Sequence, residues 1–334
     1  MAFGKAGKAS GLVVRLMMDT SNFDRNSKKS QKSLRNMQNA MKGFTAVAAG
    51  VGLGLGGIAA GFAAITKTGA ELQDTIVRAN ALLGDKGSTG TMKKLKAAAV
   101  DFGKSTQFTA NEAGKAMQEF AKQGMSAKQA IEATKPALSV ATIGATDLAS
   151  ASDFVGTSLK QFSMGADEAG DVADTLAVAL TSTRADFESL RNAMVYAGPA
   201  ARAFGMDLDE AVAASAAFIE MGLDGTLAGN AFKMAMQKLQ KPTQKAADAL
   251  KKVGLSMDDI TPGAIGANGE VVSFSDTITR LSKAADITGQ DIVEIFGARA
   301  GSPMTVLIEQ ARSGVNVVDR LNEALSGKNG LSKR

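Results

Sequence analysis

Between residues 68 and 312 the chain consists of short amphipathic segments, each beginning with a residue typical of a helix N-terminus. The clearest start is Thr109 with Glu112, which together form the S/T-x-x-E capping box. Apolar residues then recur at the spacing of one helix face, as at Met117 and Phe120. Alanine and methionine, both good helix formers, are abundant, and only five of the 334 residues are proline. We therefore expect an all-α fold: a succession of amphipathic helices arranged as a helical-hairpin array, with a Gly-rich apolar helix near the N-terminus and little or no β-structure.

One helix pattern occurs twice in the sequence. The pattern E-A-x-x-A-x-x-x-F-x-x-x-G begins at Glu112 and again at Glu210, and a weaker version begins at Glu168. Its final positions are Gly124 and Gly222, and glycine is the usual residue that ends a helix. The pattern predicts one helix design used repeatedly, with a small-residue face and an aromatic anchor. The alternative is a chance likeness between Ala-rich helices.

The sequence divides into four parts by composition. Residues 1–43 form a basic N-terminal segment, with nine basic and two acidic residues. Residues 44–66 form an apolar segment, residues 67–312 form the helical domain, and residues 313–334 form a polar C-terminal tail. We expect its last part, residues 327–334, to fray or to continue into further sequence, because chain ends that bury little are poorly ordered.

The apolar segment contains 22 consecutive residues without a charge, 44–65, and this length matches a membrane-spanning helix. Its glycines form overlapping small-xxx-small pairs, a spacing that lets helices approach closely in lipid. The expected packing residues are Gly50, Gly52, Gly54, Gly56, Gly57 and Gly61. The alternative is a helix buried inside an oligomer, because alanine and glycine contribute little to membrane insertion.

The basic segment next to this run has two interpretations. Its lysines and arginine can contact phosphates, either of lipid headgroups or of DNA. They can also be the solvated face of an amphipathic helix between about residues 27 and 42. The expected phosphate-contacting residues are Lys28, Lys29, Lys32, Arg35 and Lys42.

A turn-rich break interrupts the helical pattern near Pro262 and the Asn268-Gly269 pair. Val271, Val272 and Phe274 beside it predict a short strand or a hairpin edge. Two further helices are expected after it, at about residues 276–285 and 289–298.

The composition excludes most catalytic chemistry. The chain has no cysteine and no histidine, so it has no disulfide, no Cys–His or Ser–His–Asp catalytic set, and no ordinary zinc site. Gly103-Lys104-Ser105 ends like a phosphate-binding loop, but Ala98 stands where that motif needs glycine, and the preceding residues look helical. The letters GxGxxG at residues 52–57 lie inside the apolar run and not between a strand and a helix. We expect no enzymatic activity, no cofactor and no metal.

Several blocks in one order resemble a known family. They are residues 70–74, 105–124, 146–149, 167–169, 196–201, 222–232 and 295–301. The sequence from about residue 69 to residue 311 resembles the conserved N-terminal region of phage tail tape measure proteins, also called minor tail proteins.

The resemblance implies a structural protein of the phage tail. Such proteins lie in the tail lumen, set tail length during assembly and leave ahead of the DNA at infection. It also implies partners: other copies of the chain, with a trimer favoured, tail tube and baseplate or tail-tip proteins, the host membrane, and non-specific contact with phage DNA. Only about 20 residues follow Ala311, which is short for a ruler. A stand-alone pore-forming or toxin-like membrane protein is the alternative function.

Overall fold

The structure is a computed structural model that describes residues 55–83, 88–266 and 269–326, with the side chains of 55–68 and of Ser326 left out. The chain divides into two compact units, Met1–Lys67 and Thr68–Arg334. The second unit is described below, together with the helix α3, which begins in the first.

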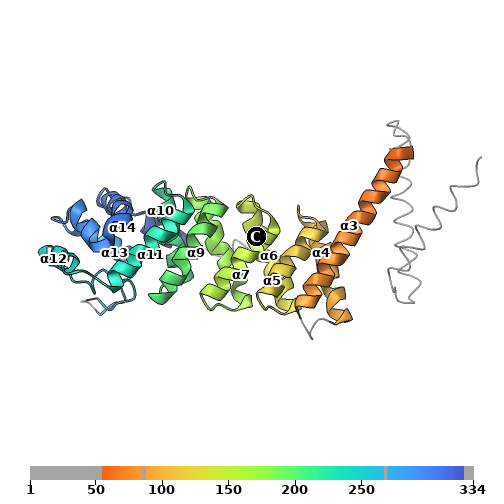
Figure 1. The fold of residues 1–334 in the computed structure, drawn as a ribbon, viewed down its shortest axis with the longest axis horizontal. Helices are drawn as coiled ribbons and strands as arrows, with labels where there is room; N and C mark the ends of the chain where they lie inside the picture. Colours follow the sequence, from red (N-terminus) through yellow and green to blue (C-terminus); the bar gives the residue numbers. More distant parts are fainter. Residues whose placement is uncertain (1–54, 84–87, 267–268, 327–334) are drawn as a thin grey trace, which may run out of the picture. The chain divides into compact units, whose positions relative to one another are not determined.

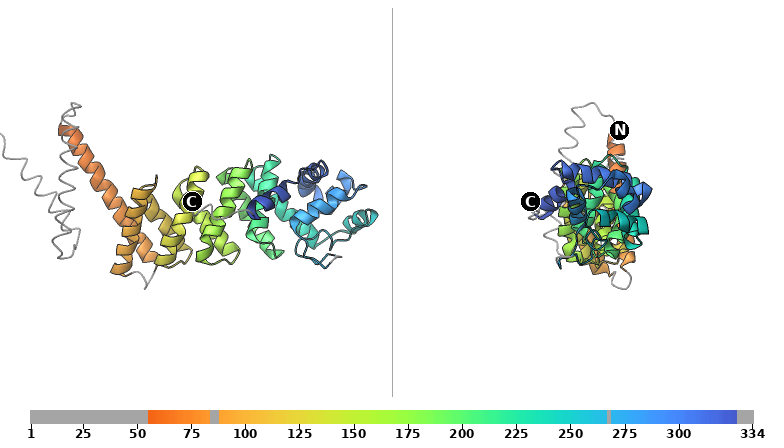
Figure 2. Two further views of the ribbon diagram at one scale, coloured as in Figure 1. Left: turned by 180° about the vertical axis from the view of Figure 1, so that it is seen from behind. Right: turned by 90° about the vertical axis from the view of Figure 1, so that its left-hand side faces the viewer.

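The prediction of an all-α fold is confirmed: the described residues form helices and one isolated β-bridge. A short 3-10 helix, η2 (Ala166–Glu168), precedes α8. The α-helices are α3 (Leu55–Leu82), α4 (Thr89–Ser105), α5 (Ala110–Lys122), α6 (Ala127–Ile143), α7 (Leu148–Gln161), α8 (Ala169–Ser182), α9 (Phe187–Ala203), α10 (Leu208–Glu220), α11 (Gly225–Gln240), α12 (Gln244–Lys252), α13 (Phe274–Lys283), α14 (Gly289–Arg312) and α15 (Val317–Ser326). In Figures 1 and 2, α4 to α11 follow one another in the order of the sequence.

The helices from α4 to α11 form four two-helix repeats. The N-cap residues of α5, α7, α9 and α11 are Thr109, Asp147, Asp186 and Asp224, which lie 38, 39 and 38 residues apart. The other row consists of α4, α6, α8 with the preceding η2, and α10. Its N-cap residues lie 38, 39 and 42 residues apart and are Ser88, Ser126, Gly165 and Asp207. A fixed period of this length is typical of helical solenoids, in which each repeat buries its apolar face against the next.

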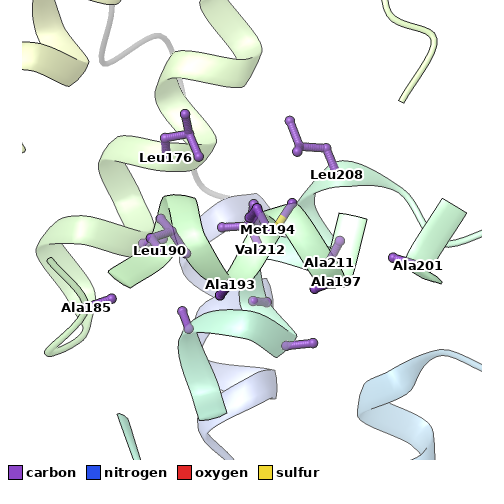
Figure 3. Packing of buried hydrophobic residues seen from close by; sticks show 14 of the residues in the cluster. Leu176, Ala185, Leu190, Ala193, Met194, Ala197, Ala201, Leu208, Ala211 and Val212 are labelled. Atoms are coloured by element: carbon purple, nitrogen blue, oxygen red, sulfur yellow. The ribbon is translucent and has the colours of Figure 1, made fainter. Parts of the chain in front are cut away.

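Equivalent positions of the repeats are buried in all four copies. The eighth residue after the N-cap of α5, α7, α9 and α11 is Met117, Val155, Met194 and Phe232, and each is buried. The fourth residue is Ala113, Ala151, Leu190 and Ala228, and each is buried as well. Figure 3 shows this core where α8, α9 and α10 meet, with Leu190, Ala193 and Met194 among the packed side chains. Alanine occupies three of the four fourth positions, at Ala113, Ala151 and Ala228, while larger side chains fill the eighth positions.

Each helix packs against the helix two places along the chain. One row runs α5, α7, α9 and α11, and the other runs α4, α6, α8 and α10. Hydrogen bonds between repeats therefore join residues about one period apart, as from Thr175 Oγ1 to Asp209 Oδ1 at 2.6 Å and from Arg184 N to Glu220 Oε2 at 2.8 Å. The predicted helical-hairpin array has this arrangement.

The repeated helix pattern noted in the sequence corresponds to α5 and α10. Phe120 and Phe218 are both fully buried, and Gly124 and Gly222 both have positive φ, at 89° and 86°. The predicted aromatic anchors and glycine stops are confirmed. The two helices belong to different rows, so this pattern is a shared helix design and not the repeat period.

α14 is a tight helical hairpin. Gly297 has φ 78° and ψ 162°, which is not helical, and it separates two helical halves. A Cβ placed on Gly301 would lie 2.7 Å from Val293 Cα, and one on Gly289 would lie 3.5 Å from a methyl group of Thr305. These contacts are symmetric about Gly297, so the two halves run back along each other. The second of the two helices predicted after the break, at 289–298, is the first half of this hairpin.

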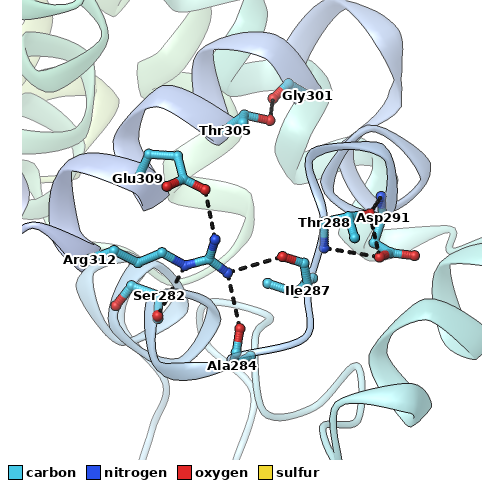
Figure 4. A network of polar contacts seen from close by, with 9 residues as sticks. All are labelled: Ser282, Ala284, Ile287, Thr288, Asp291, Gly301, Thr305, Glu309 and Arg312. Atoms are coloured by element: carbon cyan, nitrogen blue, oxygen red, sulfur yellow. Dashed lines mark hydrogen bonds and ion pairs between the residues drawn. The ribbon is translucent and has the colours of Figure 1, made fainter.

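Arg312, at the end of α14, joins this hairpin to α13. Its guanidinium donates to the backbone carbonyls of Ser282, Ala284 and Ile287 at 3.3, 3.0 and 3.1 Å, and to Glu309 Oε1 at 2.7 Å (Figure 4). Ser282 and Ala284 lie at the C-terminal end of α13, where carbonyls lack helical partners, so a cation is favourable there.

The expected membrane-spanning helix at 44–66 is not supported. Residues 44–54 lie outside the described residues, and from Leu55 the chain forms one helix that continues past residue 66 to Leu82. The helix continues because residues 67–82 keep an apolar face, in which Leu72, Ile76 and Ala79 are buried. Among the helices of the described residues, none combines the length and the hydropathy that crossing a bilayer requires.

The expected polar tail at 313–334 differs from the structure at its start. Residues 317–326 form α15, which packs against α8 and α10. Val317, Val318, Leu321 and Leu325 lie on one face of α15 and are buried, and this spacing is that of an amphipathic helix. Residues 327–334 lie outside the described residues.

The predicted strand or hairpin edge near Val271 is a single antiparallel bridge between Ile265 and Val271. Val272 is buried beside it, and Phe274 is the first residue of α13. The break therefore forms a loop with one bridge, and no strand is formed in the described part of the chain.

Candidate functional site

Most residues that the sequence singled out as a site lie where the structure gives no side-chain description. Gly50, Gly52 and Gly54, and all five basic residues at positions 28, 29, 32, 35 and 42, lie outside the described residues. Gly56, Gly57 and Gly61 lie in the first part of α3, of which only the backbone is described. Their roles in helix packing and in phosphate contact stay predictions.

Helices α9 and α11 are in direct backbone contact. A Cβ on Gly225 would lie 2.1 Å from the carbonyl oxygen of Ser189, and one on Gly229 would lie 2.2 Å from that of Ala193. Both glycines thus touch the backbone of α9 directly. The two pairs share one offset of 36 residues, so α9 and α11 lie parallel and in register.

Further along the same two helices the chain leaves a groove of about 340 Å³. We call it the α9–α11 groove, and its apolar lining includes Val195, Tyr196, Pro199 and Phe204. Val195 is 52% exposed, which is high for a valine in a helix of the core repeats. Lys233 of α11 places its ammonium group 5.9 Å from the centre of the Tyr196 ring, a cation–π contact that keeps a positive charge at the groove.

The repeats provide an internal comparison for this groove. Val195, Tyr196 and Pro199 are the ninth, tenth and thirteenth residues after the N-cap of α9. The same positions hold Gln118, Glu119 and Lys122 in α5, and Gly156, Thr157 and Lys160 in α7. Packing within the solenoid therefore does not require apolar residues at these positions, and the apolar lining of the groove is a departure from the repeat.

Two carboxylates with raised pKa lie where α10, α13 and α15 meet. Burial raises the pKa of Glu210, and the nearby Asp207 and Asp276 carboxylates act in the same direction, while the hydrogen bond that Glu210 accepts from the backbone N–H of Phe274 opposes them. Burial also raises the pKa of Asp319, against the hydrogen bond from Asn316 Nδ2 at 2.7 Å. Asp319 accepts a hydrogen bond from Ser275 Oγ as well. These groups fasten the first turn of α13 to its neighbours.

The residues that end like a phosphate-binding loop lie in a helix. Gly103, Lys104 and Ser105 are the last three residues of α4, and Ala98 lies within the same helix, so no strand precedes a phosphate loop here. No group of three or more acidic side chains among the described residues is placed to hold a metal ion.

Comparison with known proteins identifies the family of this fold. The model of a family described as "Phage-related minor tail protein" matches residues 96–297, more than half of the chain. The chain belongs to this family. No solved structure matches it.

Two relatives of the chain carry tape measure names. The chain is 28% identical over 335 residues to the "Tape measure protein" of Pneumococcus phage Dp-1, and this match covers 96% of the chain and 28% of that protein. It is 27% identical over 285 residues to the "Probable tape measure protein" of Escherichia phage P2, covering 85% of the chain and 34% of that protein. The chain thus spans about a third of the length of these relatives.

The region matched by the minor tail family contains the groove and the close contact beside it. It begins within α4 and ends at Gly297, the residue that reverses the chain in α14. The resemblance blocks at 196–201 and 222–232 lie on α9 and at the start of α11. They hold Tyr196 and Pro199 of the groove, and Gly225 and Gly229 of the close contact.

Sequence reasoning did not find the groove or the repeat period. The period was visible as Thr109, Asp147, Asp186 and Asp224, four capping residues 38 or 39 positions apart. The signal for the groove was the contrast between Val195 and Gln118 at equivalent positions, which only the repeat alignment reveals.

Proposed function

We propose that this chain acts as a structural, non-enzymatic part of a phage tail, with the role of a tape measure protein in tail assembly. The observation that carries the proposal is the match to the Dp-1 tape measure protein over 96% of the chain. The fold supports it, because a solenoid of stacked helices offers long surfaces for assembly.

The proposal places the chain in the tail, in contact with copies of itself and with tail tube and tail-tip proteins. The finer roles are setting tail length, leaving the tail ahead of the DNA and entering the host envelope. The match covers 28% and 34% of the two relatives, so length determination is a separate part of the proposal and has its own test below.

The test is tail assembly in a phage that lacks the chain, with the chain supplied from a plasmid. We expect no complete tails by electron microscopy without the chain, and restored tails with it. A matched pair of variants on α11 links assembly to the fold. Gly229→Leu inserts a side chain into the backbone contact with α9 and should fail to restore tails, whereas Leu227→Ala, at a site 60% exposed, should restore them. Normal tails without the chain would refute the proposal, and recovery of the chain only as a free membrane protein would favour the pore-forming alternative.

Length determination is tested by duplicating one repeat, residues 126–164. If the residues of the chain act as an extended helical ruler, the tail should lengthen by about 1.5 Å per inserted residue. Tails of unchanged length would assign the ruler to other sequence and leave the assembly role intact.

A further inference from the structure

A loop next to the groove exposes the most accessible large apolar residues of the described chain. Ile265 and Val271 are each 68% exposed, and they lie opposite each other as the two residues of the single β-bridge. Glu270, beside Val271, is exposed as well. We call these three residues the apolar loop, since they form an apolar pair with one negative charge.

The apolar loop and the α9–α11 groove lie on adjoining surface. Phe204 lines the groove, and a Cβ on Gly263, at the base of the loop, would lie 2.1 Å from the Phe204 carbonyl oxygen. The loop does not cover the groove of its own chain, because Ile265 and Val271 stay 68% exposed and Val195 stays 52% exposed.

We infer that the apolar loop of one copy of the chain binds in the α9–α11 groove of a second copy. Ile265 and Val271 supply apolar side chains for a groove lined by Val195, Tyr196 and Pro199. Glu270 supplies a carboxylate for Lys233, so the charges of the two surfaces are complementary as well.

The adjacency of the two surfaces favours a second copy as the occupant. A face that carries both a projection and the hollow that receives it is complementary to itself, which is the requirement for contact between identical chains. Loss of water from Ile265, Val271 and Val195 provides the driving force, and the Lys233–Glu270 pair sets the orientation. This inference rests on the self-association that belongs to the proposed function, and it names the surfaces that carry it.

Cysteine cross-linking between copies tests the contact, since the native chain has no cysteine. Purified Val195→Cys is mixed with purified Val271→Cys under mild oxidation, and a disulfide-linked pair is expected. The control mixes Val271→Cys with Leu227→Cys, which is similarly exposed on α11 but is not among the groove residues. We expect at least tenfold more cross-linked product from the first mixture. Equal yields from the two mixtures would overturn the contact.

A charge exchange provides a second, independent measurement. Lys233→Glu and Glu270→Lys should each weaken self-association about tenfold by analytical ultracentrifugation, and the variant with both changes should recover it. Circular dichroism confirms that each variant is folded. A wild-type chain that remains monomeric at all concentrations, or single variants that associate as the wild type does, would overturn the inference. Tail assembly in the phage is a separate readout, so failure here differs from failure of the proposed function.

Discussion

Two glycines decide how closely α9 and α11 approach. Gly225 and Gly229 lie four residues apart on one face of α11 and contact the backbone of Ser189 and Ala193. Glycine in a helix interior lowers helix stability by about 1 kcal/mol relative to alanine, so the presence of Gly229 inside α11 calls for a packing reason. Here the reason is direct backbone contact.

We predict that Gly229→Ala lowers the free energy of unfolding by about 2 kcal/mol, measured by urea denaturation. The new methyl group would lie 2.2 Å from the Ala193 carbonyl oxygen, and relieving that overlap requires the two backbones to separate, which outweighs the gain in helix propensity. The control is Gly69→Ala in α3, where the new methyl group meets nothing within 4 Å. That variant should gain about 1 kcal/mol from helix propensity. A gain of stability at both positions would contradict the close-contact argument.

Ser163 offers the opposite experiment. It ends α7 with φ 57°, in the left-handed region where a side chain is strained, while Gly124 occupies the equivalent position after α5 with φ 89°. We predict that Ser163→Gly raises the unfolding free energy by about 0.5–1 kcal/mol, and that Gly124→Ala lowers it by about 1 kcal/mol. Thermal unfolding of the two variants measures both changes. Equal shifts in one direction would show that backbone strain does not control these positions.

Sequence reasoning worked at the residue scale wherever a local rule applied. The box of Thr109 and Glu112 forms as predicted, with Glu112 N to Thr109 Oγ1 at 3.2 Å and Thr109 N to Glu112 Oε2 at 2.7 Å. Gly124 and Gly222 end helices as predicted. The roles of Gly225 and Gly229 depend on which helix lies opposite, and no local pattern contains that information.

Among the elements, α13 is held at its first turn by side chains of two neighbouring helices. It has ten residues, and side chains of α10 and α15 bind its first turn: Glu210 accepts from Phe274 N, and Asp319 accepts from Ser275 Oγ. Both carboxylates carry a raised pKa. Their ionised forms are therefore disfavoured in the folded chain, although they hold the helix in place.

This arrangement predicts a pH dependence with a definite sign. A carboxyl whose pKa is higher in the folded chain than in the unfolded chain destabilises the fold when ionised, and that cost disappears as the pH falls from above the folded pKa to below the ordinary value. We therefore expect the wild-type chain to become more stable relative to Glu210→Gln as the pH falls from 7 to about the ordinary glutamate range. The charged groups that face Glu210 and Asp319 are the same in the wild type and in Glu210→Gln. They are Asp207, Asp276, Glu323 and Lys283.

The measurement is urea denaturation of the wild type and of Glu210→Gln at several pH values, and an identical pH profile would contradict the prediction.

At lower pH a second group of carboxyls has the opposite effect. Hydrogen bonds from Ser150 and Thr288 lower the pKa of Asp147 and Asp291, and the bond from Arg191 lowers that of Glu188. Their stabilisation is lost as the pH falls below ordinary carboxyl values toward the lowered ones, so stability should pass through a maximum.

The prediction of a polar tail at 313–334 is wrong for residues 317–326, which form α15. The apolar residues of α15 recur at helical spacing between polar ones, and Val318 and Leu321 among them are fully buried. The membrane-spanning helix expected at 44–66 is not supported in the described part of the chain, where α3 begins at Leu55 and continues to Leu82.

At the scale of the whole molecule, the period of 38 to 42 residues organises the helices from α4 to α11 in the second unit. Each repeat contributes one helix to each row, and the caps recur although their chemistry changes from Thr109 to Asp147 and from Ser88 to Gly165. The all-α class could be predicted from helix propensity and apolar spacing. The period could not be read from the repeated helix pattern, because that pattern joins α5 of one row to α10 of the other. The groove could not be predicted either, because its apolar lining stands out only when equivalent positions of the repeats are compared.

A solenoid with this period should tolerate the removal of one whole repeat. Deleting residues 126–164 joins Met125 to Gly165, so that η2 and α8 follow α5 as α6 does in the complete chain, and both rows keep their order. We predict a folded protein with the same helicity per residue by circular dichroism, a lower urea midpoint and a smaller dependence on urea, because less surface is exposed on unfolding.

The control deletion removes residues 127–147, which takes out one helix instead of two. α7 would then take the place of α6, and every later helix would move into the opposite row. The buried face of each of these helices would then meet the wrong neighbours. Buried residues such as Leu190 and Phe218 would lose their partners, so this shorter deletion should give a chain that does not unfold cooperatively. If the shorter deletion folded and the longer one did not, the stability of the chain would not be a sum over two-helix repeats, and the solenoid account of the fold would have to be abandoned.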